Sequence, residues 1–174
     1  DARQPPPGRA HTSLEVPTPG GPMHVLLTVP DGPPPYPAVV LLHGGPEWAD
    51  PDDLDPWEQA LVDHGYAVVK PNYRGSTGST VAWRRALHGG NIGLPEVADV
   101  VAALDRVVAD STVDPGAVAV EGWSWVSATA AYRPLLEALE DPDRFVVAHH
   151  LLCQFKTPPG TLVPPGTVMT SATL

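Results

Sequence analysis

The fold is decided by the stretch Ala117-Val118-Ala119-Val120-Glu121-Gly122-Trp123-Ser124-Trp125, in which an apolar run leads directly into a glycine and a serine. A continuously apolar run of this length is typical of a strand buried on both faces of a parallel sheet. The helix-prone residues 128–139 follow it. A serine at a tight strand-to-helix turn exposes its hydroxyl above the sheet, where backbone N–H groups can stabilise a developing oxyanion. The pattern predicts Ser124 as a nucleophile, and a serine that only caps the next helix is the alternative.

Further strands and helices alternate along the rest of the chain. Apolar runs at residues 38–42, 66–70 and 145–148 predict strands, and helical spacing predicts helices over residues 54–64, 80–87 and 94–109. Strands and helices that alternate in this way form βαβ crossovers. We therefore expect an α/β fold with a mostly parallel sheet and helices on both faces, which binds ligands beyond the carboxyl ends of its strands.

Prolines and glycines mark the boundaries of this core. Short β-prone runs at residues 13–16 and 23–29, separated by Pro-Thr-Pro-Gly-Gly-Pro, predict an N-terminal hairpin. Prolines also gather at residues 158–165, near the end of the chain. We expect three parts: an arm and hairpin over 1–34, a partial α/β core over 35–150, and a Pro/Thr-rich tail over 151–174.

The composition excludes several classes of partner. The formal net charge is −10 and no run of Lys or Arg is present, which argues against a nucleic-acid or anionic-membrane surface. Cys153 is the single cysteine, so no internal disulfide can form, and a reducing compartment is compatible with this. No apolar run reaches membrane-spanning length and the first residues lack a signal-peptide pattern. We expect a soluble chain in the cytoplasm.

Several stretches in a fixed order carry a family resemblance. They are His43-Gly44-Gly45-Pro46, residues 65–69, Pro71-Asn72-Tyr73-Arg74-Gly75-Ser76-Thr77-Gly78, Glu96 with Asp99-Val100, and Val113-Asp114-Pro115. In order and spacing the chain resembles the prolyl oligopeptidase family, and especially its acylaminoacyl-peptidase-like branch, from about Pro35 to Gly122. The resemblance implies an α/β-hydrolase fold, incomplete here at its C-terminus, and a serine peptidase that cleaves short peptides.

The same resemblance assigns roles at matching positions. It implies that Ser124 is the acylated nucleophile and that the N–H groups of Gly45 and Trp125 form the oxyanion hole. A glycine at position 45 lets the backbone approach a substrate carbonyl without a Cβ in the way, although a simple turn is the alternative reading. For Arg74 we favour an internal ion pair or loop-stabilising hydrogen bonds over a carboxylate clamp for substrate. His43 is expected to be structural, because this fold supplies its catalytic histidine after the serine.

The chain departs from the family pattern after the serine. Val126 stands where the family has glycine, so we expect a distorted turn there and a gain in stability from Val126→Gly. No residue can be assigned as the acid or the histidine of a triad. His149 or His150 as a substitute base is less favoured than a solvated or packed histidine. Residues 75–78 lack the Gly-Lys-Ser/Thr ending of a phosphate loop, and no cofactor is implied.

The leading prediction is a serine peptidase that acts through an acyl-enzyme on a peptide or small acyl substrate. Two alternatives remain: a carboxylesterase for small esters, and a truncated or degenerate hydrolase-fold protein without catalysis. For the chain alone we expect little or no activity, because neither base nor acid is identified. An open sheet edge would also favour self-association.

Overall fold

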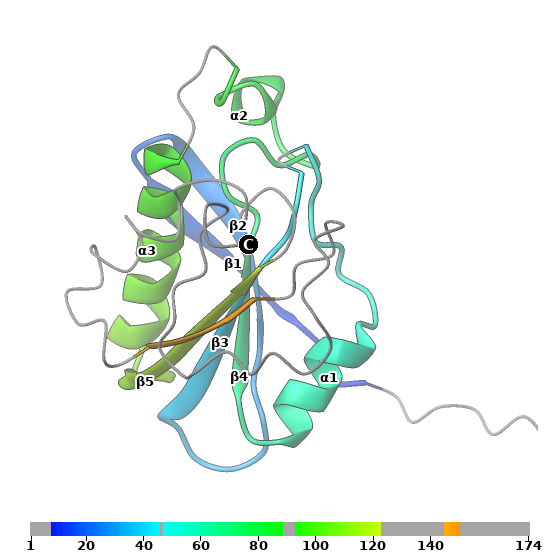
Figure 1. The fold of residues 1–174 in the computed structure, drawn as a ribbon, viewed down its shortest axis with the longest axis vertical. Helices are drawn as coiled ribbons and strands as arrows, with labels where there is room; N and C mark the ends of the chain where they lie inside the picture. The colour runs from blue at the N-terminus through cyan, green and yellow to red at the C-terminus, as the bar shows by residue number, and fades with distance from the viewer. Residues whose placement is uncertain (1–7, 46, 89–92, 123–144, 150–174) are drawn as a thin grey trace, which may run out of the picture.

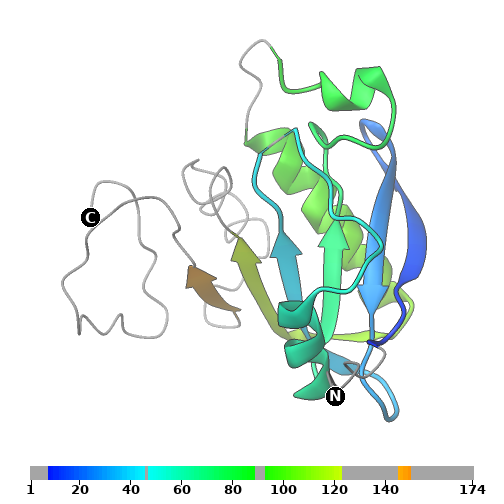
Figure 2. The same cartoon turned by 90° about the vertical axis from the view of Figure 1, so that its right-hand side faces the viewer.

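The structure is a computed structural model that describes residues 8–45, 47–88, 93–122 and 145–149. Its elements are, in chain order, β1 (Thr12–Thr18), β2 (Gly21–Thr28), β3 (Tyr36–Leu42), α1 (Pro56–Asp63), β4 (Ala67–Pro71), α2 (Val81–Arg84), α3 (Leu94–Ala109), β5 (Val113–Gly122) and β6 (Phe145–His149). The strands form one six-stranded sheet in the order β1-β2-β4-β3-β5-β6. Figure 1 labels the elements, and the strands lie side by side in the view of Figure 2.

The sheet is mixed. β3 pairs in parallel with both β4 and β5, and β5 pairs in parallel with β6. β1 and β2 form the predicted hairpin, and β2 also pairs antiparallel with β4. The α/β class is confirmed, but the hairpin is part of the same sheet. All five residues of β4 are buried, so the backbone N–H and C=O groups on the side of β4 away from β3 need hydrogen-bond partners. The antiparallel strand β2 supplies these partners.

α1 and α3 cover opposite faces of the sheet (Figures 1 and 2). Val39, Leu41 and Val68 pack with Val62 of α1. The alternate residues of the strands face α3 and form a second, larger hydrophobic cluster with it. This cluster includes Ala38, Val40, Val69 and Val120 of the strands and Val97, Val100, Ala103, Leu104 and Val107 of α3. The crossovers β3-α1-β4 and β4-α3-β5 run in opposite directions across the sheet. Because such connections are right-handed, the two helices must lie on opposite faces.

The helix boundaries follow their caps. α3 spans the predicted residues, whereas α1 begins at Pro56, two residues later than predicted. Asp55 caps α1: its Oδ1 accepts hydrogen bonds from the N–H groups of Trp57 (2.9 Å) and Glu58 (3.4 Å). A proline at the first helical position fits this start, and Leu54 is left outside the helix. α2 is limited to one turn.

β5 is longer than the predicted residues 117–120. It pairs with β3 at Tyr36↔Val113 and again at Ala38↔Val118, so β5 carries extra residues between these two pairs. The Asp114 Oδ1 accepts a hydrogen bond from the Gly116 N–H (2.8 Å), which closes the extra residues into a turn. Beyond the turn the register is regular and ends at the pair Leu42↔Gly122. The predicted helix over 128–139 lies outside the described residues.

Candidate active site at the carboxyl edge of the sheet

The loops predicted to carry the chemistry leave the sheet from neighbouring strand ends. Leu42, the last residue of β3, pairs with Gly122, the last residue of β5. Since the two strands are parallel, the loop at residues 43–45 and the chain leading to Ser124 start side by side at one edge (Figure 2). Ser124 and Trp125 themselves lie outside the described residues, as does Val126. The predicted approach of Ser124 to Gly45 therefore stays a prediction.

Gly45 has a backbone conformation that only glycine adopts readily. Its φ is +135°, and a Cβ built at this position would lie 2.9 Å from the Glu47 nitrogen and 3.1 Å from the Trp48 nitrogen. Within the described residues its N–H donates no hydrogen bond. The loop after β3 therefore presents a backbone donor that is free to bind an acceptor, which an oxyanion hole requires.

His43 is a buried structural residue, as predicted. Only 2% of it is exposed, its Nδ1 lies 2.8 Å from the Gly44 carbonyl oxygen, and its Nε2 lies 2.9 Å from the Ser76 Oγ. Its ring stacks on Tyr73 with the ring centroids 4.4 Å apart. Burial lowers the pKa of His43 to about 4, against a smaller opposing effect of the hydrogen bond to Gly44. The imidazole is therefore neutral near pH 7, and both of its nitrogens are engaged.

Arg74 forms the predicted internal ion pair. Its Nε and Nη2 donate to the two Asp99 carboxylate oxygens, each at 2.8 Å, and its backbone N–H donates to the same carboxylate at 2.9 Å. Nη2 also donates to the Pro95 carbonyl (2.9 Å). The Asp99 side chain is fully buried. These bonds fix the loop after β4 to α3, so the guanidinium is engaged within the protein.

Comparisons with known proteins agree with this arrangement. The sequence model of the prolyl oligopeptidase family matches residues 53–130, which include Arg74, Asp99 and Ser124. The acylamino-acid-releasing enzyme of Sus scrofa is 35% identical over 124 residues, which are 70% of this chain and 16% of that protein. The chain belongs to the prolyl oligopeptidase family.

Further members of the family match in sequence and in structure. Acylamino-acid-releasing enzyme 1 of Oryza sativa subsp. japonica is 40% identical over 88 residues, covering 51% of this chain and 11% of that protein. The puromycin-hydrolyzing peptidase of Mycobacterium tuberculosis superposes with a TM-score of 0.70 at 27% identity, over 86% of this chain and 24% of that chain. The chain thus spans a quarter or less of each of these relatives.

A buried polar cluster beside α1 was not predicted from the sequence. The fully buried Glu58 accepts hydrogen bonds from the Lys70 Nζ (2.7 Å) and from the Thr28 hydroxyl, and its Oε2 lies 2.9 Å from the His11 Nε2. Burial raises the pKa of Glu58, but these hydrogen bonds outweigh burial and lower it. Lysine in an otherwise apolar strand was the available signal, because a buried ammonium group requires an acidic partner.

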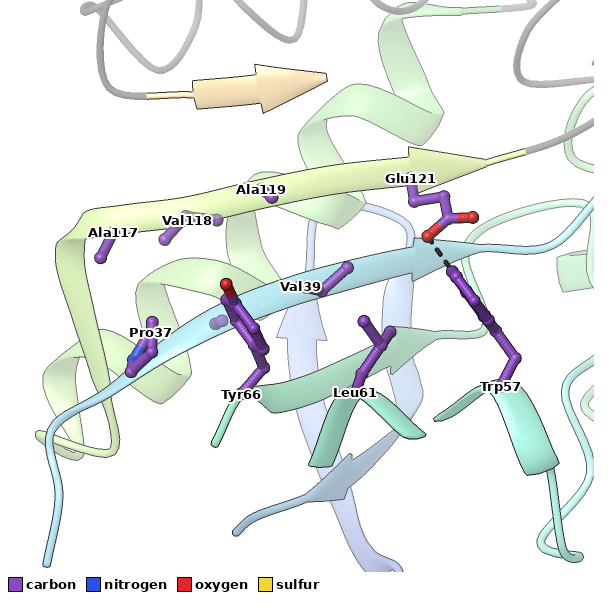
Figure 3. A pocket seen from close by; sticks show the side chains of 10 residues that line it. Pro37, Val39, Trp57, Leu61, Tyr66, Ala117, Val118, Ala119 and Glu121 are labelled. Carbon is purple, nitrogen blue, oxygen red and sulfur yellow. Dashed lines mark hydrogen bonds between the residues drawn. The ribbon is translucent and has the colours of Figure 1, made fainter. Parts of the chain in front are cut away.

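Figure 3 shows an apolar cavity of about 490 Å³ along the α1 face of β3 and β5. Trp57 and Tyr66 line it and are 47% and 38% exposed, and the Trp57 Nε1 donates to the Glu121 Oε2 at 3.1 Å. Its lining residues come from β3, β5, α1 and Tyr66, so the loop at residues 43–45 takes no part in it. We therefore assign the cavity no role in the reaction.

Two other predicted features can be placed only in part. His149 ends β6 and pairs in register with Gly122, which puts its backbone at the same carboxyl edge. His150 lies outside the described residues. Among the helices that the structure describes, none has the length and apolar character needed to cross a bilayer.

Proposed function

We propose that this chain is the nucleophile-bearing part of a serine peptidase that cleaves short peptides through an acyl-enzyme on Ser124. The observation that carries the proposal is the Gly45 N–H in the loop after β3, which has no hydrogen-bond partner among the residues that the structure describes and lies on the loop next to the strand that leads to Ser124. Membership of the prolyl oligopeptidase family supports it, because the proteins it matches are named as acylamino-acid-releasing enzymes and peptidases.

The proposed reaction is acyl transfer to water. The Ser124 hydroxyl attacks the peptide carbonyl carbon, and the negative charge that develops on the oxygen is bound by the N–H groups of Gly45 and Trp125. The C–N bond then breaks, the amine leaves with a proton, and water hydrolyses the acyl ester and restores the hydroxyl. His43 is not the base in this scheme, because it is buried and its ring nitrogens already lie against Gly44 and Ser76.

The fold family, the cellular location and the state of association belong to the same proposal. We assign the sheet to the α/β-hydrolase fold, which is supported by the mixed sheet, by its helices on both faces and by the superposition on a peptidase of the family. A cytoplasmic location rests on Cys153 as the single cysteine. Self-association would use β6, an edge strand of the described sheet.

The test is acylation of the purified chain. The wild type, Ser124→Ala and the matched control Ser127→Ala are incubated with a fluorophosphonate probe, an activated ester and an N-acetylated amino-acid anilide. Without an identified base, we expect slow reaction, about 10³–10⁴ above water. Peptide mapping by mass spectrometry should find the label on Ser124, and the label should be lost only in Ser124→Ala.

Each of the other outcomes identifies an alternative. Equal labelling in all three proteins would contradict a nucleophilic role for Ser124 and leave a non-catalytic hydrolase-fold protein. Turnover of the ester without any turnover of the anilide would favour a carboxylesterase. Fast, stoichiometric labelling that Ser124→Ala abolishes would contradict the expected low activity and make His149 and His150 the first candidates for a base.

A further inference from the structure

His43, Tyr73 and Ser76 form a buried group directly beneath the loop that carries Gly45. His43 follows β3, whereas Tyr73 and Ser76 lie in the loop after β4. We propose that His43 is a positioning residue, which orients the peptide group between Gly44 and Gly45 so that the Gly45 N–H points toward the substrate oxygen. This inference rests on the proposed function, because it assigns Gly45 to the oxyanion hole.

The peptide group between Gly44 and Gly45 has a geometry that fixes where its N–H points. The Gly44 carbonyl and the Gly45 N–H belong to the same planar trans peptide unit, in which the C=O and the N–H point in opposite directions. The carbonyl oxygen lies 2.8 Å from the His43 Nδ1. A hydrogen bond that holds this oxygen toward the imidazole therefore directs the Gly45 N–H away from it, out of the buried group.

The contact with Gly44 also depends on where the proton of His43 lies. A carbonyl oxygen can only accept, so the contact with Gly44 requires the proton of His43 to lie on Nδ1. Ser76 donates its hydroxyl proton to the Tyr73 carbonyl at 2.5 Å or to the His43 Nε2 at 2.9 Å. A neutral imidazole with its proton on Nδ1 fits only the second choice, because the lone pair on Nε2 then needs the Ser76 proton, whereas donation to Tyr73 would require a proton on Nε2. Protonation of Nε2 would leave the bond to Gly44 in place, so the orientation of the peptide does not depend on the charge of His43.

The imidazole ring of His43 is held in place by its neighbours. Tyr73 stacks on the imidazole at an interplanar angle of 11°, and its hydroxyl donates to the backbone carbonyl of His43. Both residues are almost completely buried. A ring held on one face and at both nitrogens cannot turn away from the Gly44 carbonyl. The left-handed φ of Gly45 is therefore maintained before any substrate arrives, which is the preorganisation that an oxyanion donor needs.

The test compares two variants that separate donation from packing. His43→Asn keeps a donor near the position of Nδ1 but loses the stacked ring, whereas His43→Phe keeps a stacked ring but has no donor. If glycine is labelled with ¹⁵N and with ¹³C in its carbonyl, an NMR experiment that correlates each amide with the preceding carbonyl detects only glycines that follow a glycine. The sequence contains three of these, Gly21, Gly45 and Gly90. The Gly45 amide resonance, identified through its loss in Gly45→Ala, can thus be followed without any activity.

We expect the Gly45 resonance to move in His43→Phe and to stay near its wild-type position in His43→Asn. Acylation of Ser124 by an activated ester should fall by about 10²–10³ in His43→Phe, as for the loss of an oxyanion donor, and by less than about tenfold in His43→Asn. Equal shifts in both variants, or none in His43→Phe, would overturn the proposal. The Gly45 resonance can move as expected even if the wild type is not acylated on Ser124. That combination would refute the proposed function but would support the contact by which His43 orients the peptide group.

A measurement on the wild type guards against a variant that fails to fold. Imidazole ¹⁵N chemical shifts at pH 7 should show His43 neutral, with its proton on Nδ1. A neutral ring whose single proton lies on Nε2 would leave Nδ1 without a hydrogen to donate and would overturn the inference without any substitution.

Discussion

The ion pair between Arg74 and Asp99 allows a quantitative prediction about stability. In Arg74→Met the side chain keeps an unbranched apolar stem but the guanidinium is lost, and the buried carboxylate of Asp99 keeps only the backbone N–H of residue 74 as a partner within this pair. Breaking a buried pair by removing one partner costs about 3–5 kcal/mol. For a protein of this size, such a loss lowers Tm by roughly 6–20 °C, at about 2–4 °C per kcal/mol.

A double variant tests whether the cost comes from the unpaired charge. Arg74→Met combined with Asp99→Leu removes both charges, and replacing a buried pair with apolar side chains is often close to neutral. We therefore expect the double variant to recover about half or more of the stability lost in Arg74→Met. Urea unfolding followed by tryptophan fluorescence gives both values, since the buried Trp83 donates to the carbonyls of Asn72 and Tyr73 in the same loop.

The matched control is the pair Arg106–Asp110 on the surface of α3. Its Nε to Oδ2 distance is 2.7 Å, similar to the buried pair, but both side chains are about two-fifths exposed (41% and 45%). Arg106→Met should cost only about 0.3–0.5 kcal/mol. A cost of Arg74→Met no greater than that of Arg106→Met, or a double variant less stable than Arg74→Met alone, would refute the role of the unpaired buried charge.

Three further predictions concern the loop after β3 and the buried polar cluster. In urea unfolding, Gly45→Ala should destabilise the chain by about 1–3 kcal/mol more than Gly32→Ala. Both glycines have positive φ, but of the two only Gly45 would place a Cβ against backbone atoms, so equal costs would contradict this prediction. The folded pKa of His43 is about 4, below the unfolded value near 6.5, so its stabilising contribution is complete above pH 6.5 and falls by about 3 kcal/mol as the pH drops to 4. Unfolding at pH 7 and pH 4 should show a smaller loss in His43→Asn than in the wild type, and equal losses would rule this out. Lys70→Met should lower the free energy of unfolding by about 3–5 kcal/mol, because the buried Glu58 carboxylate loses its cation. Adding Glu58→Gln should restore part of this stability, and a further loss of stability in the double variant would contradict the explanation.

Local patterns were enough to predict most elements of the core. The apolar run at residues 38–42 became β3, and the spacing of valines over residues 94–109 predicted α3 to the residue, because one face of that helix is continuously buried. The structural reading of Arg74 is also confirmed, since a guanidinium in a loop that packs on an acidic helix finds a carboxylate within the protein.

Features that depend on contacts distant in sequence could not be predicted in this way. The pairing of β2 with β4 joins Val25 to Pro71, and nothing in either segment alone specifies the other. The buried cluster likewise brings His11, Thr28 and Glu58 to Lys70 from four separate segments. The later start of α1 is a different case, because it could have been predicted. Asp55 and Pro56 form a recognisable cap and first turn, but the prediction followed the hydrophobic spacing, which includes Leu54.

The loop after β4 links the stability of the fold to the geometry of the candidate site. Arg74 fixes this loop to Asp99 of α3, and its neighbours Tyr73 and Ser76 hold His43 beneath the loop that carries Gly45. A change at Asp99 therefore has a path of direct contacts to the Gly45 N–H that includes no residue expected to touch substrate. The Gly45 amide resonance should therefore move in Arg74→Met and remain unchanged in Arg106→Met. Both substitutions remove an arginine from an ion pair with an aspartate of α3 or its C-cap, but only Arg74 lies on this path of contacts.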